Sequence, residues 1–104
     1  MIKRTVDQSG KGWFTGPWET DIPVALGYAN AAVDDPHEHH SMYEVYLVAR
    51  GTSVAVVDGR QVDLRAGDLL LVEPGEAHTF VNGSDDYLHF VVQAPFVAGD
   101  KRST

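Results

Sequence analysis

The chain has 104 residues, and an apolar fraction of 43% with a charged fraction of 22% is ordinary for one compact globular domain. Eight basic and fifteen acidic side chains give a net charge of −7, which disfavours nucleic acid and anionic membrane surfaces as partners. The sequence contains no cysteine, which excludes disulfides and thiolate metal sites, and no apolar run reaches the roughly 20 residues of a membrane helix.

Residues 1–20 combine glycine and polar residues with a cluster of bulky side chains, Trp13, Phe14, Pro17 and Trp18. No helical or strand period is present there, so we predict an arm of the same domain that covers a sheet or a neighbouring subunit. The open edges of a small β domain must also be covered, and we therefore expect a homodimer. The opening residues show no apolar signal core, so we expect a cytoplasmic protein.

Residues 21–98 are predicted to form a single β domain, followed by a polar, loose tail at 99–104. Apolar and β-branched runs predict strands at 24–29, 43–50, 52–57, 60–64, 69–72, 79–81 and 87–93. The dipeptide Asp58-Gly59 is typical of a tight hairpin between two of them. No segment has a sustained helical period, and short strands separated by turn residues indicate an all-β sandwich or barrel.

Three of the five histidines fall in the run His37-Glu38-His39-His40, and Glu44 follows at the start of the strongest predicted strand. In an extended segment, side chains two residues apart point to the same face, so His37 and His39 can present two imidazoles to one point. A register shift would instead place Glu38, His40 and Glu44 on that face.

A further histidine, His78, lies far along the chain, after a proline–glycine turn. Together, three imidazoles and one carboxylate suit a divalent transition metal, namely iron, manganese, nickel, copper or zinc. The residue types do not identify which ion is bound.

The spacing His37-x-His39-x4-Glu44-x6-Gly51, followed by Pro74-Gly75, His78 and Asn82, resembles the two motifs of the cupin superfamily, in particular its small bacterial single-domain members. The resemblance covers about residues 26–93. It implies a small antiparallel β-barrel of the jelly-roll (double-stranded β-helix) type, with a metal inside one end. The ligands that it implies are His37, His39, Glu44 and His78.

Strand alternation predicts the side chains that line the cavity beside the metal. Tyr46 and Val48 share the face of Glu44, Phe80 and Asn82 share the face of His78, and His89 lies in the last strand. For Val48 and Phe80 an ordinary place in the core is a sufficient alternative. His89 is either a half-buried strand histidine or an acid–base group of the pocket.

The cupin resemblance implies a metal-dependent enzyme that acts on a small organic molecule, and we expect dioxygenase-type oxidation. Glu44 and Tyr46 are the predicted catalytic residues, with Glu44 either a metal ligand or a base, and Tyr46 and Phe80 shaping an apolar wall. A redox-neutral isomerase, lyase or cyclase is one alternative. A non-catalytic domain that binds a sugar or an acid is the other, because fold does not determine function.

Overall fold

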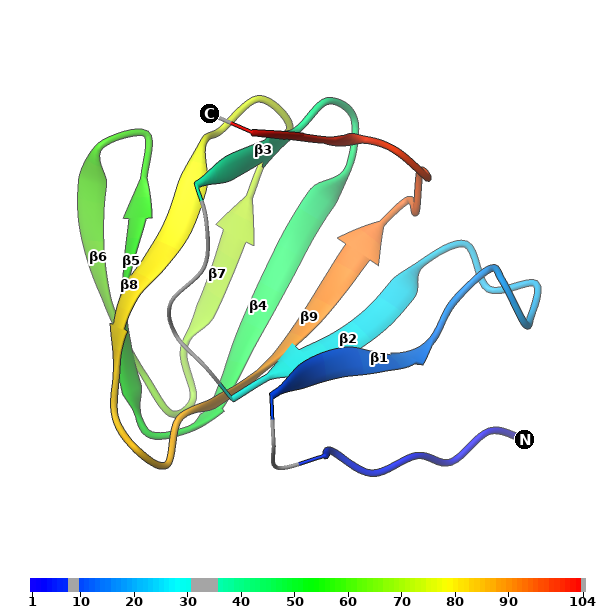
Figure 1. Cartoon of the computed structure of the whole chain (residues 1–104), viewed down its shortest axis with the longest axis horizontal. Coiled ribbons are helices and arrows are strands. Elements are labelled where there is room, and N and C mark those ends of the chain that lie inside the picture. The colour runs from blue at the N-terminus through cyan, green and yellow to red at the C-terminus, as the bar shows by residue number, and fades with distance from the viewer. Residues whose placement is uncertain (8–9, 31–35, 104) are drawn as a thin grey trace.

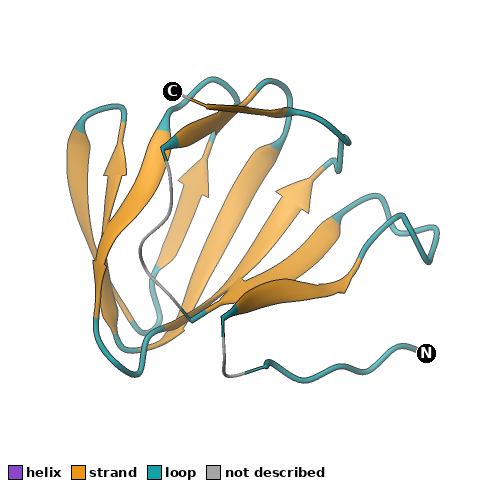
Figure 2. Ribbon diagram, in the orientation of Figure 1, coloured by secondary structure: helices purple, strands orange, loops and turns teal. Residues whose placement is uncertain are grey.

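The computed structural model describes residues 1–7, 10–30 and 36–103, which form ten strands and no helix (Figures 1 and 2). The strands are β1 (Lys11–Thr15), β2 (Ala25–Ala29), β3 (His37–His39), β4 (Tyr43–Arg50), β5 (Thr52–Val57), β6 (Arg60–Arg65), β7 (Leu69–Val72), β8 (His78–Gly83), β9 (Leu88–Ala94) and β10 (Lys101–Ser103). Within these residues, no helix is long and apolar enough to span a membrane.

The strands form two antiparallel sheets that enclose one core, which confirms the predicted small antiparallel barrel. The first sheet has the order β1-β2-β9-β4-β7, and the second has the order β10-β3-β8-β5-β6. Both sheets, together with Tyr87 just before β9, supply the core side chains, which are Tyr46, Val48, Ala55, Leu64, Val72, Phe80 and Tyr87. Burial of this shared apolar face is what holds the sheets together.

Strand β4 shows most clearly how the sequence specifies the barrel. Glu44, Tyr46 and Val48 are buried, whereas Tyr43 and Leu47 on the opposite face are exposed. Because β4 lies between β9 and β7, the register of this strand fixes which residues of both neighbours face inward.

The predicted hairpin at Asp58-Gly59 is confirmed. Asp58 has a φ of 48° and Gly59 a φ of 79°, as a tight two-residue turn requires, and the turn joins β5 to β6.

Two strands occur where irregular structure was predicted. Lys11–Thr15 in the predicted arm forms β1, which pairs with β2 at the edge of the first sheet. Lys101–Ser103 in the predicted loose tail forms β10, which pairs with β3 at the edge of the second sheet. Both are short edge strands whose pairing depends on a distant partner, so local alternation does not reveal them. Residues 8, 9 and 104 of these segments lie outside the described residues.

Gly51 at the β4–β5 junction provides a test of the packing. Its φ is 75°, and an added Cβ would lie 2.4 Å from Ser84 Oγ and 2.8 Å from the Cα of Tyr87. At Gly59, with a φ of 79°, an added Cβ would meet nothing within 4 Å. We expect Gly59→Ala to lower the free energy of unfolding by about 1–2 kcal/mol through backbone strain. Gly51→Ala should lower it by about 1–3 kcal/mol more, because its methyl group overpacks the junction.

Urea unfolding of the two glycine variants measures this difference. Equal losses of stability would show that the β4–β5 junction relaxes around the added methyl group.

Candidate metal centre

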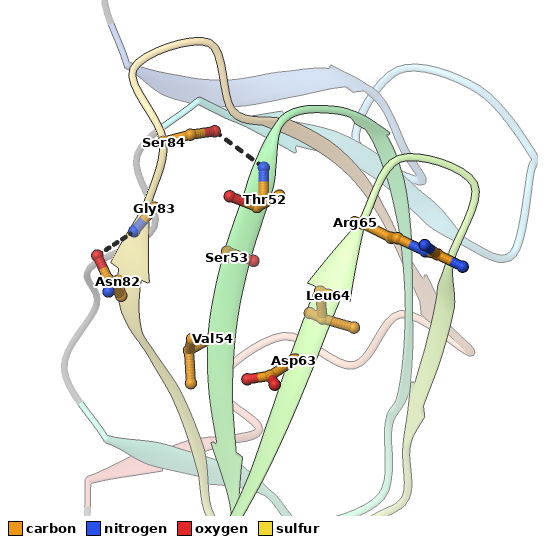
Figure 3. A pocket seen from close by; sticks show the side chains of 9 residues that line it. All are labelled: Thr52, Ser53, Val54, Asp63, Leu64, Arg65, Asn82, Gly83 and Ser84. Atoms are coloured by element: carbon orange, nitrogen blue, oxygen red, sulfur yellow. Dashed lines mark hydrogen bonds between the residues drawn. The ribbon is translucent and has the colours of Figure 1, made fainter.

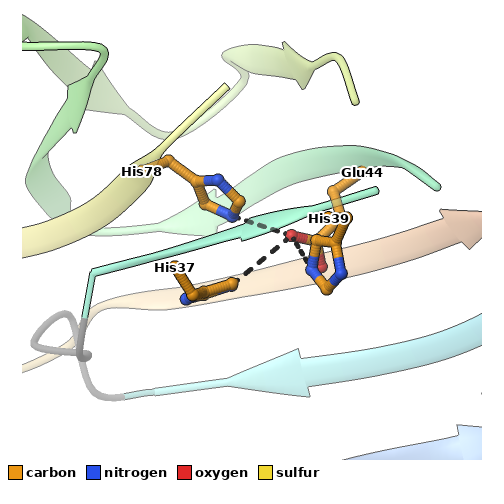
Figure 4. A group of neighbouring side chains, drawn as sticks. All are labelled: His37, His39, Glu44 and His78. Carbon is orange, nitrogen blue, oxygen red and sulfur yellow. Dashed lines mark hydrogen bonds and ion pairs between the residues drawn. The ribbon is translucent and has the colours of Figure 1, made fainter. Parts of the chain in front are cut away.

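Four side chains from three strands meet inside the barrel (Figure 4). His37 and His39 come from β3, Glu44 from the start of β4 and His78 from the start of β8. One nitrogen or oxygen atom of each residue lies within 4.8 Å of the corresponding atoms of the others. All four side chains are buried. The cluster therefore has the composition and proximity that a divalent metal requires.

The contacts converge on one oxygen atom, Glu44 Oε1. It lies 2.8 Å from His78 Nε2, 3.0 Å from His39 Nε2 and 3.8 Å from His37 Nε2. The Tyr46 hydroxyl also donates a hydrogen bond of 2.9 Å to it. A carboxylate oxygen has two lone pairs and cannot accept from four donors. Among the described residues, the buried His39 Nε2 has no hydrogen-bond partner of acceptable geometry. Hydrogen bonds from the imidazoles to Glu44 therefore cannot satisfy all four residues. A metal cation that accepts one lone pair from each residue fits this arrangement better.

The carboxyl group of Glu44 is ionised. Burial by itself raises its pKa, but the adjacent imidazoles of His37, His39 and His78, together with the Gln93 amide, outweigh burial and hold the pKa of Glu44 well below its ordinary value. The Gln93 amide donates to the second oxygen, Oε2, at 3.0 Å. Glu44 is thus held as an anion, which is the form that binds a metal.

A turn before β8 orients His78. The backbone N–H of Glu76 donates to the carbonyl of Glu73 at 3.1 Å, and the Glu76 side chain accepts from the N–H of Glu73 at 2.8 Å. The carbonyl of Glu76 lies 3.0 Å from His78 Nδ1. Because a carbonyl only accepts hydrogen bonds, Nδ1 carries a proton, which leaves Nε2 as the nitrogen that would bind a metal.

The structure places His39, not His40, in the cluster. His39 is buried, whereas His40 is exposed and accepts a 2.8 Å hydrogen bond from Arg102. The alternation of β3 is therefore regular, and the alternative register with Glu38 and His40 facing Glu44 does not occur.

The cluster opens into a hollow of about 580 Å³ between the two sheets. Its lining includes three of the four cluster residues, His37, His39 and Glu44, and three predicted pocket residues, Tyr46, Phe80 and His89. Further lining comes from Gly10, Lys11, Gly12, Trp13, Tyr28, Ala29, Val91, Gln93 and Lys101. The wall is mixed, with aromatic and aliphatic side chains next to a few polar groups, as is usual for small-molecule sites.

Two predicted pocket residues lie elsewhere. Val48 is packed in the core, next to Tyr46 but not on the hollow. Asn82 is exposed and lines a different hollow of about 550 Å³ over β8, β5 and β6, which Arg65 lines from the opposite side (Figure 3). The prediction that Asn82 shares the face of His78 is wrong, because the register between β5 and β8 shifts between Val54 and Ala55. This β-bulge turns Asn82 away from the face of His78.

Several residues at the hollow were not predicted. Val91 and Gln93 follow His89 at intervals of two on β9, so alternation from His89 could have identified them. Lys11 and Lys101 come from the two unpredicted edge strands and could not be placed by alternation.

The imidazole of His89 is oriented by a hydrogen bond with Tyr87. The Tyr87 hydroxyl forms a hydrogen bond with His89 Nδ1, and burial raises the pKa of Tyr87, which keeps that hydroxyl neutral. The His89 ring also lies against Tyr46 and Phe80, with centroid distances of 5.0 and 4.9 Å. These contacts fix the orientation of the imidazole in the wall of the hollow.

Residues 27–93 match the family described as the cupin domain. Over 55 residues the chain is 31% identical to the oxalate-binding protein of Thermotoga maritima, a match that covers 53% of this chain and 46% of that protein. Over 66 residues it is 29% identical to the pectin degradation protein KdgF of Dickeya dadantii, covering 62% of this chain and 60% of KdgF. The chain thus matches less than two thirds of either protein.

Among solved structures, that of Pac13, described as a nucleoside dehydratase, superposes with a TM-score of 0.74. It is 18% identical, and the match covers 98% of this chain and 91% of Pac13. At that identity the likeness establishes a shared fold. Together with the family match over residues 27–93, it shows that this chain belongs to the cupin family.

Proposed function

We propose that this protein is a metal-dependent enzyme that acts on a small organic anion inside the barrel. The observation that carries the proposal is the group of three imidazoles and one ionised carboxylate, of which His37, His39 and Glu44 line a hollow of about 580 Å³. When bound there, a divalent transition metal would polarise a substrate oxygen or, if the ion is redox-active, would support dioxygen chemistry.

An anion is the preferred substrate class because of the charges around the hollow. Lys11 and Lys101 contribute to its lining from β1 and β10, in a protein whose net charge is −7. A metal cation bound by the cluster would add positive charge at the end of the hollow that His37, His39 and Glu44 line. The oxalate-binding relative supports the same class, since its ligand is a small carboxylate.

The position of Tyr46 favours redox-neutral proton transfer over oxidation. Its hydroxyl donates to Glu44 Oε1 at 2.9 Å and lies 3.4 Å from His78 Nε2, so it stands directly beside the ligand atoms. A phenol in that place can give a proton to a leaving group or take one from a substrate. The description of Pac13 as a dehydratase supports this class.

The dioxygenase reaction stays a prediction and is the second candidate. Four protein ligands leave two positions of a six-coordinate ion open, enough for a substrate atom and dioxygen. Oxygen uptake by iron-loaded protein would favour this candidate.

The role of Tyr46 can be tested by substitution. We expect Tyr46→Phe to retain its metal but to lose turnover by roughly 10²- to 10⁴-fold, the range for a lost acid–base group. The assay loads the protein with zinc, manganese or iron(II) and screens hydroxy, keto and sugar acids by liquid chromatography coupled to mass spectrometry. The product sought is either lighter by one water or of unchanged mass with a different retention time.

Tyr43→Phe is the matched control, because Tyr43 lies on the exposed face of the same strand. Wild-type turnover in Tyr46→Phe would remove the acid–base role. If the metal-loaded wild type binds an acid but converts none of the screened compounds, the protein is a binding domain and not an enzyme.

The homodimer also stays a prediction. Tyr43, Leu47, Leu69 and Leu71 are exposed on β4 and β7, on the outer face of the first sheet. This apolar surface, rather than the aromatic arm alone, is available to a second copy of the chain.

A further inference from the structure

The strand that carries two of the four cluster residues is held mainly by the last residues of the described chain. Strand β3 pairs with β8 at a single position, His37 with His78. It pairs with β10 along its whole length, with Lys101 opposite His39 and Ser103 opposite His37 (Figure 1, where the red segment runs along β3). The register of His37 and His39 therefore depends on β10.

Asp100, just before β10, ties that strand to the turn after His39. Its carboxylate accepts hydrogen bonds from the backbone N–H groups of Ser41, at 3.0 and 3.1 Å, and of Met42, at 2.9 Å. It also accepts from the Ser41 hydroxyl at 2.9 Å, and its backbone carbonyl accepts from His40 N–H at 3.2 Å. Asp100 as a whole residue is only 7% exposed to solvent. A buried carboxylate with this many donors is a fixed part of the fold.

The same carboxylate faces the outer edge of the His39 ring. Asp100 Oδ2 lies 4.0 Å from His39 Nδ1, while Nε2 on the other side of the ring faces Glu44. Among the described residues, His39 Nδ1 has no hydrogen-bond partner. A negative charge beside Nδ1 favours the tautomer with hydrogen on Nδ1, which leaves the lone pair on Nε2 for a metal.

We propose that Asp100 is a positioning residue of the metal centre, which sets both the backbone of β3 and the ring tautomer of His39. The proposal rests on the metal binding included in the proposed function. Asp100 would act on the metal through His39 and does not itself belong to the cluster of candidate ligands.

The test compares Asp100→Asn with wild type by zinc titration in competition with a chromophoric chelator. Asparagine has nearly the same shape but lacks the charge, and we expect zinc affinity to fall about 10- to 100-fold, the usual cost of losing such a partner. Arg102→Gln is the matched control, because Arg102 belongs to β10 and is exposed. Its zinc affinity should equal that of wild type.

A second readout separates positioning from mere support of the fold. Long-range proton–nitrogen spectra of the zinc-loaded protein should show His39 as a single tautomer with hydrogen on Nδ1 in wild type, and as a mixture in Asp100→Asn. If Asp100→Asn does not fold, Ser41→Ala replaces it, because that change removes one hydrogen bond to Asp100 and should weaken zinc binding several-fold.

Unchanged zinc affinity in a folded Asp100→Asn variant, or in Ser41→Ala if that variant is needed, overturns the proposal while the proposed function stands. Failure of the wild type to bind zinc, manganese or iron(II) overturns both, and this outcome is distinguished by the wild-type titration alone.

Discussion

His39→Ala and His78→Ala should each purify with almost no metal, whereas wild type should contain close to one transition-metal ion per chain. Each substitution removes one of three imidazoles around Glu44 Oε1 and leaves a buried cluster with too few donors. Elemental mass spectrometry on untagged protein gives the metal-to-chain ratio directly.

His40→Ala is the control for this experiment. His40 is next to His39 in sequence but exposed and outside the cluster, so its variant should keep the wild-type metal content. Full occupancy in both His39→Ala and His78→Ala would mean that the metal is held somewhere else.

The identity of the metal then separates the two candidate reactions. Zinc at full occupancy favours the redox-neutral reaction in which Tyr46 transfers a proton. Iron, manganese, nickel or copper directs attention to oxygen uptake. If the wild-type protein contains no metal and takes up none when metal is added, the barrel is a binding domain that functions without metal.

The second large effect is on thermal stability. A ligand that binds only the folded state stabilises it by about 2.7 kcal/mol when its free concentration is about 100 times Kd. For a domain of this size each kcal/mol raises Tm by roughly 4–8 °C. We therefore expect zinc at that concentration to raise the Tm of wild type by about 10–20 °C.

Differential scanning calorimetry of chelator-treated protein, with and without added zinc, measures this shift. His39→Ala should show almost no shift, and chelator should reverse the shift in wild type. An unchanged Tm in wild type at saturating zinc would mean that the four residues do not bind zinc in the folded state.

Where side chains alternate along a buried strand, the sequence was sufficient to predict the structure. Strand β4 begins and ends where predicted, and its regular alternation placed Glu44 and Tyr46 on the inner face. The hairpin at Asp58-Gly59 was predicted from a local backbone preference that needs no information from the rest of the chain.

The sequence-based predictions fail where the structure of a segment depends on pairing with a strand that is distant in the sequence. Asn82 left the predicted face because a bulge between β5 and β8 interrupts alternation, and a bulge depends on the partner strand. Asp100 could not be identified, since its contacts with Ser41 and His39 join residues 59 and 61 positions apart in the chain. In the same way, Lys101 was assigned to a loose tail because three polar residues form a strand only when β3 is beside them.

The order of the strands has a consequence for how the protein is made on the ribosome. Strand β9 lies between β2 and β4, so the first sheet cannot close until residue 94 has emerged. The cluster needs still more, because β3 is aligned by β10. His37, His39 and His78 are therefore all synthesised before the strand that aligns two of them, and the cluster reaches its geometry only after β10 has paired with β3.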